Sequence, residues 1–101
     1  MFRLPSSRPP VTPGEILLHD YIEPMGLTQS SVAESIGVPF QRLNGVVRGR
    51  RALTPSTALR LAKFFGTSAG FWVNLQARVD TWNALQAERD EIERIVPAIA
   101  A

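Results

Sequence analysis

At the centre of the chain lies the segment Gly37-Val38-Pro39-Phe40-Gln41-Arg42-Leu43-Asn44-Gly45-Val46-Val47-Arg48-Gly49-Arg50-Arg51. Leu43, Val46 and Val47 recur at helical spacing, so the segment predicts a short helix over about residues 39–47 with one apolar side. Gly49 can adopt a positive φ and would end this helix, and arginines crowd that end. A short helix placed after a turn and before arginines can present side chains to a DNA major groove while the basic groups hold phosphates.

The residues before this segment complete a helix-turn-helix pattern. Thr28 is a favourable N-cap, and Ala33 and Ile36 lie on the inward face of the helix that follows it. Ala33 is small where two helices must approach closely, and Gly37 permits the sharp turn between them. The helix over about residues 39–47 is therefore the candidate recognition helix.

Further helices are predicted on both sides of this pair. Thr12 and Glu15 predict a capping box in which Glu15 reaches back to the Thr12 N–H, and Pro24 stops the helix that begins there. Thr54 begins another helix, with a proline at its first position, and Gly66 closes it.

Ser68 caps a last helix, which we expect to run to about Val96, a length of about 26 residues or ~40 Å. Its apolar residues form a near-heptad stripe: Phe71, Trp72, Leu75, Val79, Trp82 and Leu85. One alternative is that this stripe only covers its own domain. A helix of this length overhangs a domain that ends near residue 66, however, and an apolar stripe on the overhang favours pairing with a second copy. We therefore expect a homodimer whose interface contains Val79, Trp82 and Leu85.

The predicted fold class is all-α, with a five-helix helix-turn-helix domain and a long C-terminal dimerisation helix. Residues 1–11 are rich in proline, serine and arginine and predict a flexible N-terminal arm. Residues 12–66 are expected to form the DNA-binding domain. Residues 67–101 are expected to form the C-terminal helix for packing and dimerisation.

The distribution of charge is more informative than the formal net charge of +2. Between Glu34 and Asp80 there is no acidic residue, and the basic residues in that window are Arg42, Arg48, Arg50, Arg51, Arg60, Lys63 and Arg78. From Asp80 onward the acidic residues outnumber the basic ones, so the two parts predict two surfaces for different kinds of partner. The alternative is that the arginines form an ordinary solvated face. It is less favoured because they coincide with the helix-turn-helix pattern.

Composition disfavours several classes of protein. The chain has no cysteine, which excludes a disulfide framework and a thiolate zinc site and fits a cytoplasmic protein. It has no apolar run of about 18 residues, so we predict no membrane span. Its first residues also lack the apolar run of a signal peptide.

The sequence carries no pattern typical of a catalytic, metal or cofactor site. His19 is the single histidine and stands beside Asp20, a pair that does not make a metal site. A Ser–His–Asp arrangement from Ser30, His19 and Asp20 is much less favoured than a surface histidine. The segment 45–49 lacks the Lys-Ser/Thr ending of a phosphate-binding loop. We predict no catalysis, no metal and no cofactor.

Several blocks of sequence together resemble the HigA antitoxins over about residues 8–82. The blocks are Arg8-Pro9-Pro10, Pro13-Gly14-Glu15-Ile16-Leu17, Leu27-Thr28-Gln29, Arg50-Arg51-Ala52-Leu53-Thr54, Thr57-Ala58-Leu59-Arg60-Leu61-Ala62, Phe65-Gly66-Thr67-Ser68 and Phe71-Trp72-Val73-Asn74-Leu75-Gln76. The wider group is the lambda-repressor-like, XRE-type helix-turn-helix proteins. The resemblance implies an antitoxin of a type II toxin–antitoxin system. Such proteins silence a HigB-type toxin, a small ribonuclease that cleaves messenger RNA, and bind double-stranded operator DNA as dimers to repress their own operon.

The resemblance also implies which residues contact DNA: Thr28, Gln29, Phe40, Gln41, Arg42, Asn44, Gly45, Arg48, Arg50 and Arg51. The first two occupy positions that contact phosphate, and Phe40, Gln41, Asn44 and Gly45 occupy positions that face base edges. Gln41 can bond an adenine at two points, and Phe40 can pack on a thymine methyl group. Arg42 is expected to reach guanine or phosphate. The arginines at positions 48, 50 and 51 are expected to hold phosphates.

This sequence departs from the family pattern at the start of the recognition helix. Relatives usually carry serine and a polar or basic residue where this chain has Pro39 and Phe40, and Val38 is a weak N-cap. Gly45 lacks a side chain at a reading position and costs about 1 kcal/mol of helix stability relative to alanine. The operator sequence therefore does not transfer from relatives.

Three functions are left open by the sequence. The first is an autorepressor that also neutralises a toxin, for which the resemblance suggests Pro9 to Leu17 as the toxin-binding region. The second is a stand-alone transcriptional regulator without a toxin partner. The third is a protein-interaction module that kept the fold and lost DNA affinity, a possibility raised by Phe40 and Gly45.

Overall fold

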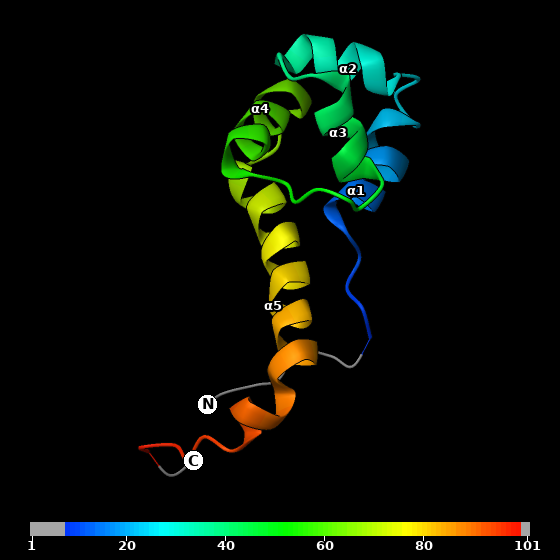
Figure 1. The fold of residues 1–101 in the computed structure, drawn as a ribbon. Helices are drawn as coiled ribbons and strands as arrows, with labels where there is room; N and C mark the ends of the chain where they lie inside the picture. Colours follow the sequence, from blue (N-terminus) through cyan, green and yellow to red (C-terminus); the bar gives the residue numbers. More distant parts are fainter. Residues whose placement is uncertain (1–7, 100–101) are drawn as a thin grey trace.

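The computed structural model describes residues 8–99. Figure 1 shows the helices of these residues, coloured along the chain. They are α1 (Pro13–Ile16), the π-helical η1 (Leu17–Ile22), α2 (Gln29–Ile36), α3 (Phe40–Val47), α4 (Pro55–Phe65) and α5 (Ala69–Glu93). α1 and η1 are continuous and together form the predicted first helix. Residues 8–99 contain no β-strand, and the all-α prediction is confirmed.

The helix starts lie at the predicted capping residues. The side chains of Thr12, Thr28, Thr54 and Ser68 each accept the backbone N–H three residues further on. The reciprocal capping box is found at Thr28, where the Oγ of Ser31 accepts the Thr28 N–H at 3.2 Å. At Thr12 the described bond is the Glu15 N–H to the threonine Oγ1, at 3.1 Å. These caps satisfy N–H groups that a helix cannot satisfy by itself.

Two predicted helix ends need correction. α3 begins at Phe40, and Pro39 is its N-cap in an extended conformation, without a side-chain capping bond. α5 ends at Glu93 rather than near Val96, and Glu88 has non-helical dihedral angles (φ −126°, ψ 18°). The polar run 86–91 offers few apolar side chains to hold a straight helix. Figure 1 shows α5 bending in its last turns.

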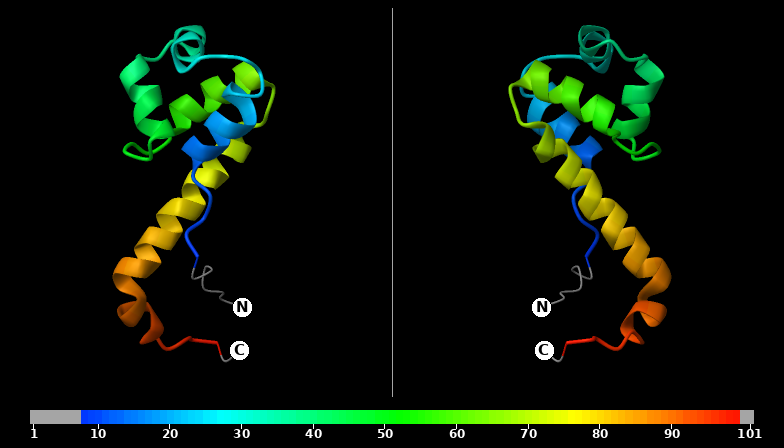
Figure 2. Two further views of the ribbon diagram at one scale, coloured as in Figure 1. Left: turned by 90° about the vertical axis from the view of Figure 1, so that its right-hand side faces the viewer. Right: turned by 90° about the vertical axis from the view of Figure 1, so that its left-hand side faces the viewer.

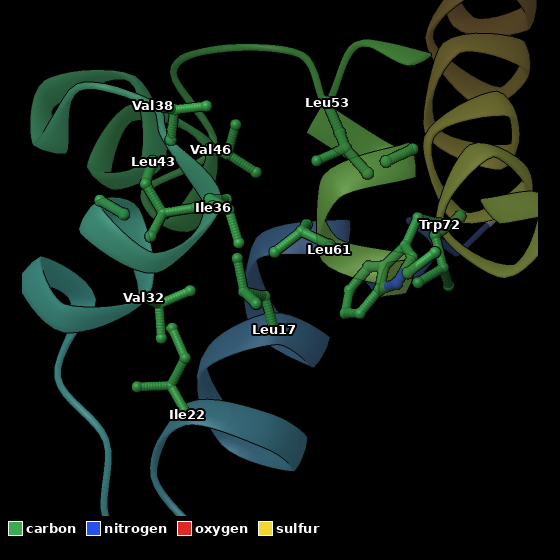
Figure 3. Close-up of a cluster of buried hydrophobic side chains, with 14 residues drawn as sticks. Leu17, Ile22, Val32, Ile36, Val38, Leu43, Val46, Leu53, Leu61 and Trp72 are labelled. Carbon is green, nitrogen blue, oxygen red and sulfur yellow. The ribbon is translucent and has the colours of Figure 1, made fainter. Parts of the chain in front are cut away.

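The core lies between α1–η1, α2, α3, α4 and the first turns of α5 (Figure 3). Leu17, Leu43 and Leu61 have no exposed surface, and neither does Trp72. The Trp72 indole N–H donates to Thr67 Oγ1 at 2.8 Å, so this large side chain is buried with its polar atom satisfied. The first turns of α5 therefore belong to the core of the helix-turn-helix domain.

The remainder of α5 extends beyond the other helices, as both views in Figure 2 show. The principal extents are 51 × 23 × 22 Å, and the radius of gyration is 16.4 Å. A compact chain of this length would have a radius of gyration of about 13 Å. The overhang expected from the sequence is present, with residues 8–12 running beside it. No helix in the described part of the chain is long and apolar enough to span a membrane.

Candidate nucleic-acid interface

One face of α3 is turned directly away from the core. Leu43 and Val46 are 0% and 3% exposed and hold α3 against the domain. At 3.6 residues per turn, Gln41, Gly45 and Arg48 project from the opposite side. Gln41 and Arg48 are exposed and Gly45 is half-buried. This outer face is where a recognition helix would meet base edges.

The first turn of α3 adds two flanking groups to this face. Phe40 is 43% exposed, so its ring is open to a partner on one flank of α3. Arg42 is exposed on the other flank of α3. Both positions are compatible with the DNA contacts expected from the sequence.

A hydrogen bond between side chains joins α2 to α3. Asn44 Nδ2 donates to Gln29 Oε1 at 2.9 Å in a partly buried position. Gln29 is the first residue of α2 and follows the cap Thr28, so the bond places the start of α2 beside the middle of α3. The bond therefore fixes the position of the start of α2, where phosphate contacts are expected, relative to the outer face of α3, where base contacts are expected.

The loop after α3 is fastened to both α3 and α5. The carbonyl of Gly45 accepts the N–H groups of Arg50 at 2.9 Å and Arg51 at 3.1 Å. Gly49 has φ +73°, as the sequence predicted, and reverses the chain. Further along, the Leu53 N–H donates to Gln76 Oε1 on α5 at 2.9 Å. The exposed arginines of the loop therefore sit on a backbone with few degrees of freedom.

Sequence reasoning missed the close packing of α1 on α3. A Cβ built on Gly14 would lie 2.2 Å from the carbonyl oxygen of Val46 and 2.8 Å from the Cα of Val47. Backbone atoms cannot give way as a flexible side chain can, so only glycine fits at this position. In the sequence, Gly14 follows the capping residue Thr12 and Pro13, and no neighbouring residue indicates that it contacts another helix.

Arg60 also has a role that the sequence did not reveal. It is one of the basic residues of the acid-free window, but its Nη1 donates to the carbonyl oxygen of Ile36 at 2.7 Å. That carbonyl lies at the C-terminal end of α2, where a positive charge is favourable. Arg60 thus holds the turn at Gly37 from α4.

The surface position predicted for His19 is confirmed. Its side chain is 61% exposed, and its Nδ1 lies 2.8 Å from Glu23 Oε1, one turn along the helix. Glu23, rather than the adjacent Asp20, is its partner. The described residues contain no group of three or more metal-ligating side chains.

The predicted dimer residues differ in their exposure. Val79 and Trp82 are half-buried on α5, whereas Leu85 is 3% exposed within the single chain. Leu85 therefore offers little exposed surface in the single chain, and its place in a dimer interface stays a prediction. It precedes the break at Glu88, where the helix changes direction. Trp82 keeps surface available, although its buried Nε1 has no hydrogen-bond partner in the part of the chain that is described.

The region suggested for toxin binding is partly inside the domain. Pro13, Gly14 and Leu17 are buried, whereas Val11 and Glu15 are exposed. Residues 8–11 form one wall of a groove of about 650 Å³ whose other wall is α5, including Arg78 and Trp82. Within the region 9–17, the surface that a partner could contact therefore lies on the arm and on one side of α1.

Comparison with known proteins agrees with this geometry. A sequence profile of the helix-turn-helix family matches residues 18–72, more than half of the chain. Antitoxin HigA-1 of Vibrio cholerae is 34% identical over 92 residues, which cover 91% of this chain and 87% of HigA-1. The chain belongs to the HigA family of helix-turn-helix proteins. This confirms the family that the sequence blocks indicated.

The fold of this HigA-family chain matches that of a DNA-bound relative. The structure of Pseudomonas aeruginosa antitoxin HigA with the higBA promoter has a TM-score of 0.84 and 32% identity, covering 91% of this chain and all of that one. An uncharacterised HTH-type transcriptional regulator of Escherichia coli, YbaQ, is 39% identical over 100 residues, covering 94% of this chain and 88% of YbaQ. These relatives are named as regulators and antitoxins rather than enzymes, as expected for a chain without a catalytic pattern.

Proposed function

We propose that this chain is an autorepressor that binds its own operator as a dimer and neutralises a HigB-type toxin. The observation that carries the DNA-binding part is the outer face of α3, where Gln41 and Arg48 project away from the core beside exposed arginines. The same fold is found in a relative whose structure contains promoter DNA.

The charge around α3 favours a polyanionic partner. Arg42, Arg48, Arg50 and Arg51 are all exposed, and the sequence has no acidic residue from position 35 to position 79. That stretch of the chain supplies no carboxylate to neutralise these arginines, and Asp80, which follows it, lines one pocket with Arg50 and Arg51. Basic groups beside a polar helix face supply the phosphate contacts and base contacts that sequence-specific binding combines.

A mobility-shift titration on the promoter region of the chain's own gene tests this part. Specific binding should exceed binding to a random duplex of equal length by about 10³-fold or more. Replacement of Arg48 by glutamine should weaken binding to both duplexes and lower the slope of log K against log salt by about 1. Equal affinity of the unaltered chain for both duplexes would exclude a repressor role.

Pairing through the overhang of α5 would place the two α3 helices about 34 Å apart, one turn of duplex DNA. Val79 and Trp82 supply the half-buried apolar surface for this contact. Sedimentation should give a dimer for the unaltered chain and a monomer for Trp82→Glu, because a buried carboxylate at the interface lacks a partner. A monomeric unaltered chain at micromolar concentration would contradict the pairing.

For toxin binding, the name of the Vibrio cholerae relative supports a partner, and the exposed residues Val11 and Glu15 lie within the expected region. Co-expression with the product of the neighbouring gene, followed by purification through that product, provides the test. Retention of the unaltered chain and loss of a Val11→Asp/Glu15→Lys variant would support the assignment. Arg89→Gln, a substitution on α5, serves as the control.

A stand-alone regulator without a toxin partner is the second candidate. It is favoured by the 39% identity to YbaQ, which is named only as a transcriptional regulator. The same co-purification separates the two functions, because a stand-alone regulator would bind its promoter and leave the neighbouring gene product free.

A further inference from the structure

The side chain of Arg51 occupies the room that a side chain at position 45 would need. A Cβ built on Gly45 would lie 3.1 Å from the Cβ of Arg51 and 3.5 Å from its Cδ and Nε. The first of these distances is shorter than an ordinary van der Waals contact. Glycine at position 45 therefore lets the arginine side chain lie directly against the helix backbone.

The backbone fixes where this side chain begins. Gly45 accepts the N–H groups of both Arg50 and Arg51, so the Arg51 Cα is tied to the same residue over which its side chain runs. An arginine on a free loop would sample many directions, and these two bonds remove much of that freedom.

The direction of the side chain follows from its position on α3. Gly45 lies one helical turn after Gln41 and opposite the buried Leu43. A side chain at position 45 would project from the outer face, and Arg51 fills that place with atoms out to Nε. The Arg51 side chain, from Cβ to Nε, therefore lies over the outer face of α3 at position 45.

We infer that Arg51 reads a guanine in the operator, through two hydrogen bonds to O6 and N7, and that Gly45 is the residue that admits it. The inference rests on the proposed DNA-binding function and deepens it. The planar fork of arginine matches those two guanine acceptors, whereas lysine keeps the charge but loses the paired geometry. At position 45 of α3, the side chain that contacts the base is then supplied by Arg51 of the following loop and not by α3 itself. Arg50, which shares the backbone anchor, remains a phosphate contact.

Selection of preferred sites from a randomised duplex pool tests this inference and does not require the operator sequence. In Arg51→Lys, the ratio of G·C to other base pairs selected at one position of each half-site should fall by about 10-fold to 100-fold. The preferences at the other positions should remain. Arg50→Lys is the matched control and should leave every preference unchanged. Equal preferences in Arg51→Lys and the unaltered chain would overturn the inference.

A second substitution tests the role of Gly45. Gly45→Ala displaces the Arg51 stem and should weaken the preference at the same base pair, with little additional loss in the Arg51→Lys background. If Gly45→Ala weakened the preference at a different base pair, or if the effects of Gly45→Ala and Arg51→Lys were additive, the inference would be overturned. If the unaltered chain selects no sequence, both the proposed function and this inference fail. A preference that survives in Arg51→Lys removes only the inference.

Discussion

The Asn44 Nδ2 donates to the Gln29 Oε1 at 2.9 Å, so the recognition helix and the helix before it share one side-chain hydrogen bond. The bond uses the oxygen of one amide and one N–H of the other. The Gln29 amide N–H groups remain available to a phosphate, and the Asn44 Oδ1 remains available to a base donor.

We predict that Gln29→Ala and Asn44→Ala each lower the free energy of unfolding by about 0.5–1.5 kcal/mol, because each removes one partner of this bond. Their combination should cost less than the sum, since the second substitution removes no further bond. Urea unfolding of the four proteins in this cycle measures the coupling. Strictly additive losses would mean that the contact contributes nothing to stability.

Gly14→Ala should destabilise the chain by more than about 2 kcal/mol, because the new Cβ would lie 2.2 Å from the Val46 carbonyl oxygen and force α1 away from α3. Gly70→Ala is the matched control, as both glycines occupy the second position of a helix. There the nearest atom to a built Cβ is Ser68 Oγ at 4.0 Å. That substitution should be neutral or stabilising by up to about 1 kcal/mol. Similar unfolding midpoints for the two variants would contradict the close packing of α1.

Arg60→Gln should lower stability by about 1–2 kcal/mol, because it removes the charge-assisted bond to the carbonyl oxygen of Ile36 at the end of α2. For a chain of this size, each kcal/mol of lost stability lowers the melting temperature by about 4–8 °C. Lys63→Gln, an exposed basic residue on the same helix, is the control and should change the melting temperature little. If the two variants melt together, Arg60 is only a surface charge.

Gln76→Leu should weaken both folding and DNA binding. It leaves the N–H of the buried Leu53 without its acceptor, a loss of about 1–3 kcal/mol, and releases the loop that carries Arg50 and Arg51 from α5. Gln86→Leu, at an exposed position of α5, should leave affinity for the promoter unchanged. Mobility-shift and thermal unfolding measurements on the same samples separate the two effects. Full DNA affinity in Gln76→Leu would show that the loop needs no such anchor.

The parts of the fold that depend on neighbouring residues were predictable from the sequence. Threonine and serine caps act within three residues, and the glycines at positions 37, 49 and 66 have the positive φ that their place after a helix required. Apolar periodicity likewise identified the buried side of α3. That pattern also indicates which side of α3 is exposed, whereas the individual residues expected to contact DNA were indicated by the resemblance to the HigA antitoxins.

The contacts that position the site were not predictable, because they join residues far apart in the chain. Arg60 reaches Ile36, and Gln76 reaches Leu53 from α5. No local signal distinguishes Arg60 from the other basic residues in the same window. The end of α5 was misjudged for a related reason, since the helix was extended through the polar run 86–91, which interrupts the apolar stripe. Leu85, which the apolar stripe places in the predicted dimer interface, is 3% exposed in the single chain.

The two tryptophans on α5 stand in different surroundings, which gives the chain two intrinsic fluorophores with separate meanings. Trp72 is wholly enclosed and hydrogen-bonded to Thr67, so its emission should change only when the domain itself melts. Trp82 is half-buried on the overhanging part of α5, where its surroundings depend on what lies against it. In a Trp72→Phe variant, a red shift of the remaining emission on dilution would record the separation of two chains before either one unfolds.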